Sequence, residues 1–307
     1  MGKSKALFAG LCAVALVGTM GLAGCTQDNG SQNSSQGANS EQQNTAEPTA
    51  SEPAEEVVLQ IFAANSLTKA MADAQALYTE QHPNVKFGDT QYEGSGTLNE
   101  MLGAGQYADI LITASKGTMD TAEEKGYVDA ATRQTMFTNQ LVIVTKAGGP
   151  LVGQDITLEQ IAAGEYTLSV GDENVPAGNY AAQSLSTVGA YTEPDGATGA
   201  DATGTGGEWS ASLLPKITFG AKVGDVCKYA ETGDVDIALV YTSDVYRMGG
   251  VEICSIVPDD THKAIVYPGA VTAQSENAQA AADFLEWCMT DDDCAKIWQE
   301  WGFDIAA

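Results

Sequence analysis

The sequence predicts an α/β protein of two lobes, in which each lobe is a mostly parallel sheet flanked by helices and two crossovers join the lobes. Two patterns and the chain length lead to this prediction. Short, continuous apolar runs alternate with segments of helical periodicity, as in parallel sheets that helices cover on both faces. The series ends and begins again near residue 146. The 307 residues are enough for two lobes of roughly 100–150 residues each.

The first series begins at Val57. Its strands are predicted from runs of β-branched and apolar residues at 57–63, 85–92, 108–113 and 141–145. Apolar residues at helical spacing predict helices that start near residues 66 and 95 and one that passes through residue 119. The order strand, helix, strand, helix, strand indicates a parallel sheet.

The second series follows with the same alternation. Strands are predicted at 168–171, 237–241, 251–257 and 264–271, and helices at 158–163, after 175–178, near 223, at 276–290 and at 293–300. We expect the last strands to return to the first sheet. The predicted lobes are therefore 57–145 with 251–307 (lobe 1) and 146–250 (lobe 2).

Residues 1–24 are predicted to be a signal peptide. Lys3 and Lys5 precede an uncharged stretch that ends in small residues, which is the order of a cleavable export signal. LAGC (22–25) resembles the bacterial lipoprotein box, which implies that Cys25 is lipid-modified and holds the protein at the cell membrane. An uncleaved membrane anchor is the alternative, since about 20 apolar residues span a bilayer. Both interpretations place the remaining chain outside the cytoplasm.

Residues 25–56 are predicted to be a disordered tether. The apolar side chains after Cys25 in this segment are four alanines, and the remainder is polar, Gly or Pro. Burial of so few apolar groups does not offset the entropy of ordering. Such a tether would keep a globular body near the membrane and leave it free to turn.

Composition and motifs exclude several classes of function. The sequence has 14 Lys+Arg against 41 Asp+Glu, for a net charge of −27. Nucleic acids and anionic membrane surfaces are bound by clustered Lys and Arg, so we expect no nucleic-acid partner. His82 and His262 are expected at the surface, and no GxSxG or GxxxxGK[ST] motif is present. We expect no enzymatic activity.

Four cysteines lie in the globular part: Cys227, Cys254, Cys288 and Cys294. The last two flank the aspartates at 291–293, between two predicted helices, and could meet across this break. An oxidising compartment permits a disulfide there, and small buried residues are the equal alternative. Because no CxxC pair is present, no structural zinc site is expected.

Four predicted helix starts suggest an anion site. Ser66, Ser95, Ala177 and the turn at Val223 each open a helix with small or hydroxyl residues. A helix N-terminus presents unpaired N–H groups and about half a positive charge. Several of them in one cleft would hold an anion without Lys or Arg. Ordinary helix capping explains each residue alone, so the hypothesis requires that the four meet.

From Val57 onward the sequence resembles the periplasmic molybdate-binding proteins of ABC transporters. The matching blocks follow one another in order over nearly the whole globular part. They include FAANSLTKAM (62–71), GSGTL (94–98), ADILITAS (108–115), VGDENVPAGNYA (170–181) and AETGDVDIALVYTSDV (230–245). The resemblance implies a type II periplasmic-binding-protein fold and a cleft that holds molybdate or tungstate by neutral donors.

The resemblance also implies a role for each site residue. Ser66 and Ser95 would each offer a hydroxyl and a backbone N–H. Ala177 and Val223 would each offer a backbone N–H, and Tyr241 its hydroxyl. No cofactor is implied, and no metal beyond the oxyanion itself.

The implied partners are an ABC permease and its cytoplasmic ATPase, which would receive the ligand from a lipid-anchored monomer. A binding protein for another oxyanion, such as sulfate or phosphate, is the alternative in the same class. Two alternatives come from other classes, an enzyme on the same fold and a sensory or adhesion lipoprotein. A turnover assay and a neighbouring permease gene would discriminate among them.

The sequence departs from the family pattern at four places. Asn65 replaces the usual small residue before the first serine and would add a polar contact or perturb the pocket. Ser115 stands where the family usually has Asp. Residues 191–208 form an insertion, interpreted as a solvated surface loop. Val226 is an alternative to Val223, because the block around them matches poorly.

Overall fold

The computed structural model describes residues 55–306. The predicted signal peptide, Cys25 and all of the predicted tether except its last two residues lie outside this part of the chain. Within it, no helix is both long and apolar enough to cross a membrane. The same residues hold no group of three or more His, Cys, Asp or Glu side chains that could bind a metal ion.

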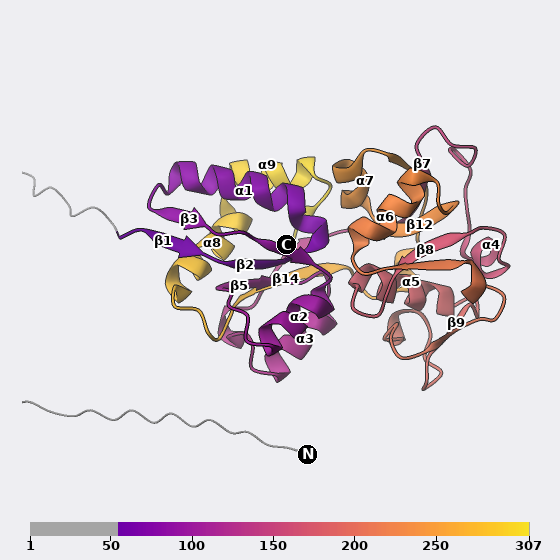
Figure 1. Ribbon diagram of the computed structural model, residues 1–307, viewed down its shortest axis with the longest axis horizontal. Helices are drawn as coiled ribbons and strands as arrows, with labels where there is room; N and C mark the ends of the chain where they lie inside the picture. Colours follow the sequence, from indigo (N-terminus) through magenta and orange to yellow (C-terminus); the bar gives the residue numbers. More distant parts are fainter. Residues whose placement is uncertain (1–54, 307) are drawn as a thin grey trace, which may run out of the picture. The chain divides into compact units, whose positions relative to one another are not determined.

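Within the described residues, and with β2, β5 and β14 labelled in Figure 1, the first sheet has six strands in the order β15-β6-β14-β5-β2-β4. They are β2 (Ile61–Ala64), β4 (Gln91–Glu93), β5 (Ile110–Ile112), β6 (Gln134–Thr138), β14 (Val266–Val271) and β15 (Asp304–Ile305). β2 pairs in parallel with β4 and β5, whereas β14 runs antiparallel to β5 and β6. The helices of this lobe are α1 (Thr68–Gln81), α2 (Ser95–Gly103), α3 (Lys116–Glu124), α8 (Ala278–Thr290) and α9 (Asp292–Glu300).

The second sheet has five strands in the order β11-β8-β12-β7-β13. They are β7 (Leu141–Lys146), β8 (Leu168–Gly171), β11 (Ile217–Gly220), β12 (Ile237–Tyr241) and β13 (Val251–Ile256). β11, β8 and β12 are parallel, and β7 is antiparallel to both of its neighbours. The helices of this lobe are α4 (Leu158–Ala162), α5 (Pro176–Ser186), α6 (Val223–Thr232) and α7 (Thr242–Met248). In each sheet most strands run in one direction, as predicted, with β14 and β15 reversed in the first sheet and β7 in the second.

Two connections join the sheets, as predicted, but not at the predicted residues. The chain passes from β6 to β7 through Asn139 and Gln140, and it returns from β13 to β14 through residues 257–265. β7 and β13 therefore belong to the second sheet, whereas the predicted boundaries put residues 141–145 and 251–256 in lobe 1. The correction has a physical reason: an apolar run identifies a buried strand and carries no information on which sheet the strand joins.

Two predicted strands of the first series are each broken in two. β1 (Val57–Leu59) and β3 (Val85–Phe87) form a separate parallel pair, and β2 and β4 continue into the six-stranded sheet. At the break, the backbone N–H of Gln60 donates to the buried carboxylate of Asp109 over 2.8 Å. This side-chain acceptor takes the place of a strand partner.

The insertion at 191–208 is partly packed: many of its residues are exposed, as expected of a surface loop, but several anchor it to the lobe. Its first residues form β9 (Tyr191–Thr192), which pairs with β10 (Glu208–Trp209), and Ala202 is fully buried. The buried carboxylate of Glu193 accepts hydrogen bonds from the Thr203 hydroxyl at 2.9 Å and from the Gly204 N–H. The composition of the loop suggested exposure because its turns are rich in Gly and Thr, which here satisfy one buried acid.

His262 is buried, which differs from the interpretation of the sequence. Two of the cysteines are buried close to each other. His262 is 3% exposed and packs edge-on against Tyr180, so the expectation of a surface residue was wrong. Cys288 and Cys294 are fully buried and are present as free thiols. The indole N–H of Trp298 reaches the carbonyl oxygen of Cys288 (3.1 Å) and the sulfur of Cys294 (3.2 Å), so the two residues do meet across the break.

Candidate functional site

A small pocket lies between the two lobes, where helices from both of them begin. All five predicted ligand-binding residues line it: Ser66, Ser95, Ala177, Val223 and Tyr241. The space among its lining residues is at most about 200 Å³, part of it open to solvent, so the pocket is too small for a drug-sized molecule.

Each pocket residue from a helix start occupies a position whose N–H has no partner inside its own helix. Ser95 and Val223 are the first residues of α2 and α6, and Ala177 is the second residue of α5. Ser66 lies in a short 3-10 turn, Asn65–Leu67, that follows β2. The first N–H groups of a helix point outward along its axis, so these four starts present donors and partial positive charge to one place. Val226, the alternative to Val223, does not line the pocket. Its N–H donates to Lys222 O at 3.3 Å within α6 and is therefore not available to a ligand.

The helices that begin at the pocket lack side-chain caps. The residues before them, Ala64, Gly94, Val175 and Lys222, accept no hydrogen bond from the helix through a side chain. By contrast, the caps of α3, α4 and α9 are made by Ser115, Thr157 and Asp291. Ser115 thus serves as an N-cap, a role that Asp fills equally well. The start of α8, away from the pocket, also lacks a side-chain cap, but at the pocket several such starts meet and leave their donors available to one ligand.

The two pocket serines are buried and held in place. The Ser66 hydroxyl lies 3.0 Å from the Tyr267 hydroxyl. The Ser95 hydroxyl oxygen accepts the backbone N–H of Ala114 at 3.0 Å, which leaves the proton of Ser95 free to donate elsewhere. Both side chains are at most 2% exposed. Each serine therefore offers a fixed donor rather than a mobile one.

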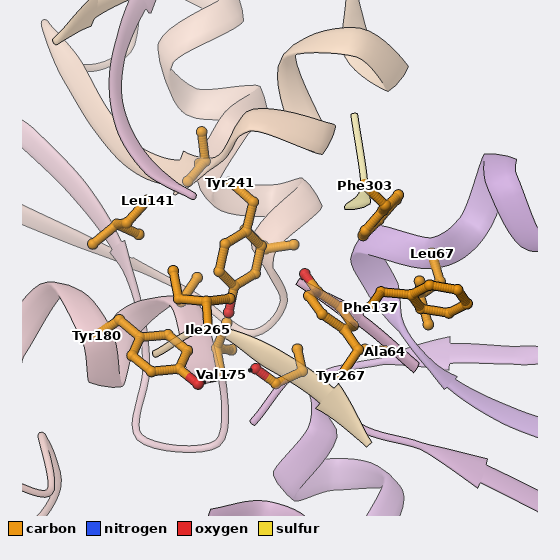
Figure 2. Close-up of a cluster of buried hydrophobic side chains, with 14 of the residues drawn as sticks. Ala64, Leu67, Phe137, Leu141, Val175, Tyr180, Tyr241, Ile265, Tyr267 and Phe303 are labelled. Carbon is orange, nitrogen blue, oxygen red and sulfur yellow. Dashed lines mark hydrogen bonds between the residues drawn. The ribbon is translucent and has the colours of Figure 1, made fainter. Parts of the chain in front are cut away.

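Tyr241 ends β12 and lies between Tyr180 and Tyr267, with its ring packed edge-on against both (Figure 2). Its hydroxyl is buried and has no hydrogen-bond partner among residues 55–306. Burial, and to a smaller extent the neighbouring tyrosines, raise the pKa of this hydroxyl well above its usual value. It therefore stays protonated at neutral pH, and it is a buried donor that lacks an acceptor.

Two further polar side chains line the pocket: Glu93, which was not expected there, and Asn65, which was expected to add a polar contact or perturb the pocket. Glu93 ends β4, and its carboxylate pairs with the Lys222 ammonium at 3.1 Å. Asn65 turns its side-chain oxygen toward the N–H of Gly224, at 3.0 Å. No Lys or Arg is among the described residues that line the pocket. Its attraction for an anion would come from neutral donors and helix dipoles.

Glycines let the lobes approach each other beside the pocket. The N–H of Gly96 donates to Asn174 O at 2.9 Å, from one lobe to the other. A Cβ at Gly96 would lie 2.7 Å from Asn174 Oδ1, and one at Gly94 would lie 3.0 Å from Ala221 O. In the Gly-Ser-Gly segment, Ser95 thus supplies hydrogen-bond donors to the pocket, and the two glycines give the opposite lobe room to approach.

Residues 59–304 match the family described as bacterial extracellular solute-binding protein. The match covers most of the chain and both lobes. The chain belongs to this family. Solute-binding proteins work outside the cytoplasm and bind a ligand without converting it, which agrees with a pocket of neutral donors.

Individual relatives narrow the comparison. This solute-binding protein is 32% identical over 263 residues to the molybdate-binding protein ModA of Escherichia coli, with 82% of this chain and 91% of the relative covered. It is 26% identical to the putative ABC transporter substrate-binding lipoprotein YvgL of Bacillus subtilis, with 80% and 86% covered. The solved substrate-binding domain of a putative molybdenum ABC transporter from Clostridium difficile is 26% identical, with a TM-score of 0.58 over 82% of this chain and 100% of that one.

Proposed function

We propose that this solute-binding protein binds molybdate or tungstate in the pocket between its lobes, as the extracytoplasmic component of an ABC importer. The observation that carries the proposal is that four uncapped helix starts meet, in one small pocket, a buried tyrosine hydroxyl that has no partner among residues 55–306. Such a site is small and rich in donors. The E. coli relative is a molybdate-binding protein, which supports the same ligand.

The donor set argues for a fully deprotonated dianion. A ligand that carries a proton would direct a donor at a donor, and one of the two would remain unpaired in a buried site. Glu93 and Asn65 contribute acceptor oxygens, but Lys222 and Gly224 occupy them. The ligand would therefore contact Ser66, Ser95, Ala177, Val223 and Tyr241.

Size would separate molybdate and tungstate from smaller anions. A sulfate in a pocket shaped for the larger ions would leave some donors too far away to bond. Molybdate and tungstate have nearly the same size and charge, so both are proposed as ligands. Another oxyanion, sulfate or phosphate, is the second candidate, and it requires that the lobes close further than a pocket shaped for molybdate.

Delivery to a permease and its ATPase is proposed from the family. The lobes would close on the ligand as a hinge about the two connections at 139–140 and 257–265, and the closed form would dock on the permease. Cys25 is proposed as the lipid attachment site. The B. subtilis relative is a putative substrate-binding lipoprotein, which supports an anchor of this kind. We propose a monomer that has no catalytic activity.

The test is a calorimetric titration of the purified protein with molybdate, tungstate, sulfate and phosphate at neutral pH. One-to-one binding of the first two, with the others much weaker, is the expected result. Tight binding of sulfate or phosphate alone would replace the ligand and keep the transport role. The absence of binding by all four would overturn the oxyanion site.

A further inference from the structure

We propose that Asn65 and Arg247 are positioning residues that tie the two lobes together beside the pocket and slow the release of a bound oxyanion. Neither residue belongs to the predicted donor set. We call the contacts of Asn65 with Gly224 and Arg247 the Asn65 bridge. This inference rests on the proposed function, because it concerns the closed form around the same ligand.

The bridge begins on the first lobe, one residue before Ser66. The side-chain oxygen of Asn65 accepts the N–H of Gly224 at 3.0 Å and the Arg247 guanidinium at 3.2 Å, both from the second lobe. The side-chain amide of Asn65 donates to Tyr92 O at 3.2 Å, within its own lobe. These contacts fix the orientation of the amide, since a flipped side chain would place its NH₂ group against two donors.

From Arg247 the contacts continue to the pocket tyrosine. The Nε and Nη2 of Arg247 bond Asp244 Oδ1 at 3.1 and 2.6 Å, and Asp244 is fully buried. The other carboxylate oxygen of Asp244 accepts the backbone N–H of Tyr241 at 3.0 Å. Because an ionised donor or acceptor strengthens a hydrogen bond, this chain holds Tyr241 firmly.

The bridge therefore links donors of both lobes. Asn65 adjoins Ser66, Gly224 adjoins Val223, and Asp244 holds Tyr241. When the lobes open, the Asn65 oxygen must leave Gly224 and Arg247 together. The bridge would make opening less favourable without contacting the anion, and it would act on release rather than on entry.

The side-chain oxygen of Asn65 lies at the pocket wall. If it accepted no hydrogen bond, it would repel an oxyanion in the pocket. Two donors from the second lobe occupy this oxygen only when the lobes are closed. The same contacts that close the lobes thus remove an unfavourable acceptor from the pocket.

The glycine in the bridge is required by space. A Cβ at Gly224 would lie 2.7 Å from the Asn65 oxygen and 3.2 Å from Arg247 Nη2. The added methyl group of Gly224→Ala is therefore expected to push the two sides of the bridge apart, while Asn65 and Arg247 remain in the sequence. This variant tests the bridge independently of Asn65→Ala.

The experiment measures release of labelled molybdate from the purified protein after dilution into excess unlabelled molybdate, together with the rate of binding. Asn65→Ala and Gly224→Ala are each expected to raise the release rate about tenfold. This is the change expected when one or two hydrogen bonds to a charged or buried group are lost. The binding rate is expected to stay nearly constant. A residue with only a structural role would not produce this separation of the two rates.

Asn99→Ala is the matched control. Asn99 is an asparagine of the same lobe that is 5% exposed, against partial burial for Asn65, and its amide donates to Thr118 O at 2.9 Å within the first lobe. Its loss is expected to leave the release rate unchanged. The proposal would be overturned if Asn99→Ala raised the release rate as much as Asn65→Ala does. It would also be overturned if both bridge variants, Asn65→Ala and Gly224→Ala, left the release rate unchanged. If the wild-type protein binds none of the four oxyanions, the proposed function fails and the bridge proposal fails with it, whereas binding with unaffected release rejects the bridge alone.

Discussion

Tyr241 and Tyr267 come from different sheets and meet edge-on with their ring centroids 5.9 Å apart, yet only one of their buried hydroxyls is hydrogen-bonded. The Tyr267 hydroxyl contacts Ser66 Oγ at 3.0 Å and Asn139 Nδ2 at 3.4 Å. The Tyr241 hydroxyl has no partner within residues 55–306. A buried polar group without a partner costs about 1–3 kcal/mol. Tyr241 is therefore arranged for an acceptor that the described chain does not supply.

Replacing Tyr241 by Phe tests this arrangement. The variant is expected to bind molybdate more weakly by about 1.5–3 kcal/mol, because a donor to a charged ligand is lost. Its ligand-free form is expected to be at least as stable as the wild type, since the unpaired hydroxyl is gone. Calorimetry and thermal unfolding measure the two effects. Tyr180→Phe is the control, and an equal loss of affinity there would contradict a specific role for Tyr241.

The pocket serines are expected to act separately from the helix caps. Ser66→Ala and Ser95→Ala should each weaken oxyanion binding by about 1–3 kcal/mol, because each removes a buried donor. Ser115→Ala removes the cap of α3 and is expected to cost about 1 kcal/mol of stability with affinity unchanged. Titration and denaturant unfolding of the three variants distinguish the effects. Unchanged affinity in both pocket variants would reject the site assignment.

Local signals in the sequence were sufficient for the parts of the fold that depend on local interactions. The apolar run at 237–241 and the small residues that open α2 and α5 predicted a strand and two helix starts, because periodicity and helix ends are properties of neighbouring residues. The family resemblance added Tyr241, which nothing in its local pattern marks as a pocket residue. The structure brings this tyrosine and the helix starts to one pocket.

Long-range contacts account for what the sequence did not predict. Asn65 meets Gly224 across 159 positions and Arg247 across 182, and no local pattern records such a pairing. The sheet that β7 joins depends on its neighbours β12 and β13 in the same way. His262 was misjudged because the polar residues around it suggest a turn, whereas its ring packs against Tyr180 on α5.

Lys222 is expected to affect binding through Glu93 rather than through the ligand. In Lys222→Gln the Glu93 carboxylate at the pocket loses its partner at 3.1 Å and repels the oxyanion. Because both side chains are about one-third exposed, water screens the effect, and we expect a loss of about twofold to fivefold in affinity. The loss should shrink as salt is added. The double variant Glu93→Gln/Lys222→Gln should recover wild-type affinity, and a failure to recover would mean that Lys222 acts on the anion directly.

The pH dependence of binding follows from the buried hydroxyl of Tyr241. Burial raises the pKa of Tyr241 well above its usual value of about 10. A group whose pKa is raised on folding contributes stability that is fully present below its unfolded pKa and is lost as the pH rises through its folded pKa. We therefore expect affinity for a fully deprotonated oxyanion to stay constant from about pH 7 to pH 10, a range over which an exposed tyrosine loses about half of its protons. Titrations across this range measure it, with Tyr241→Phe as the reference. A decline below pH 10 in the wild type that is absent from Tyr241→Phe would show that the hydroxyl ionises early and is not the protected donor inferred from its burial.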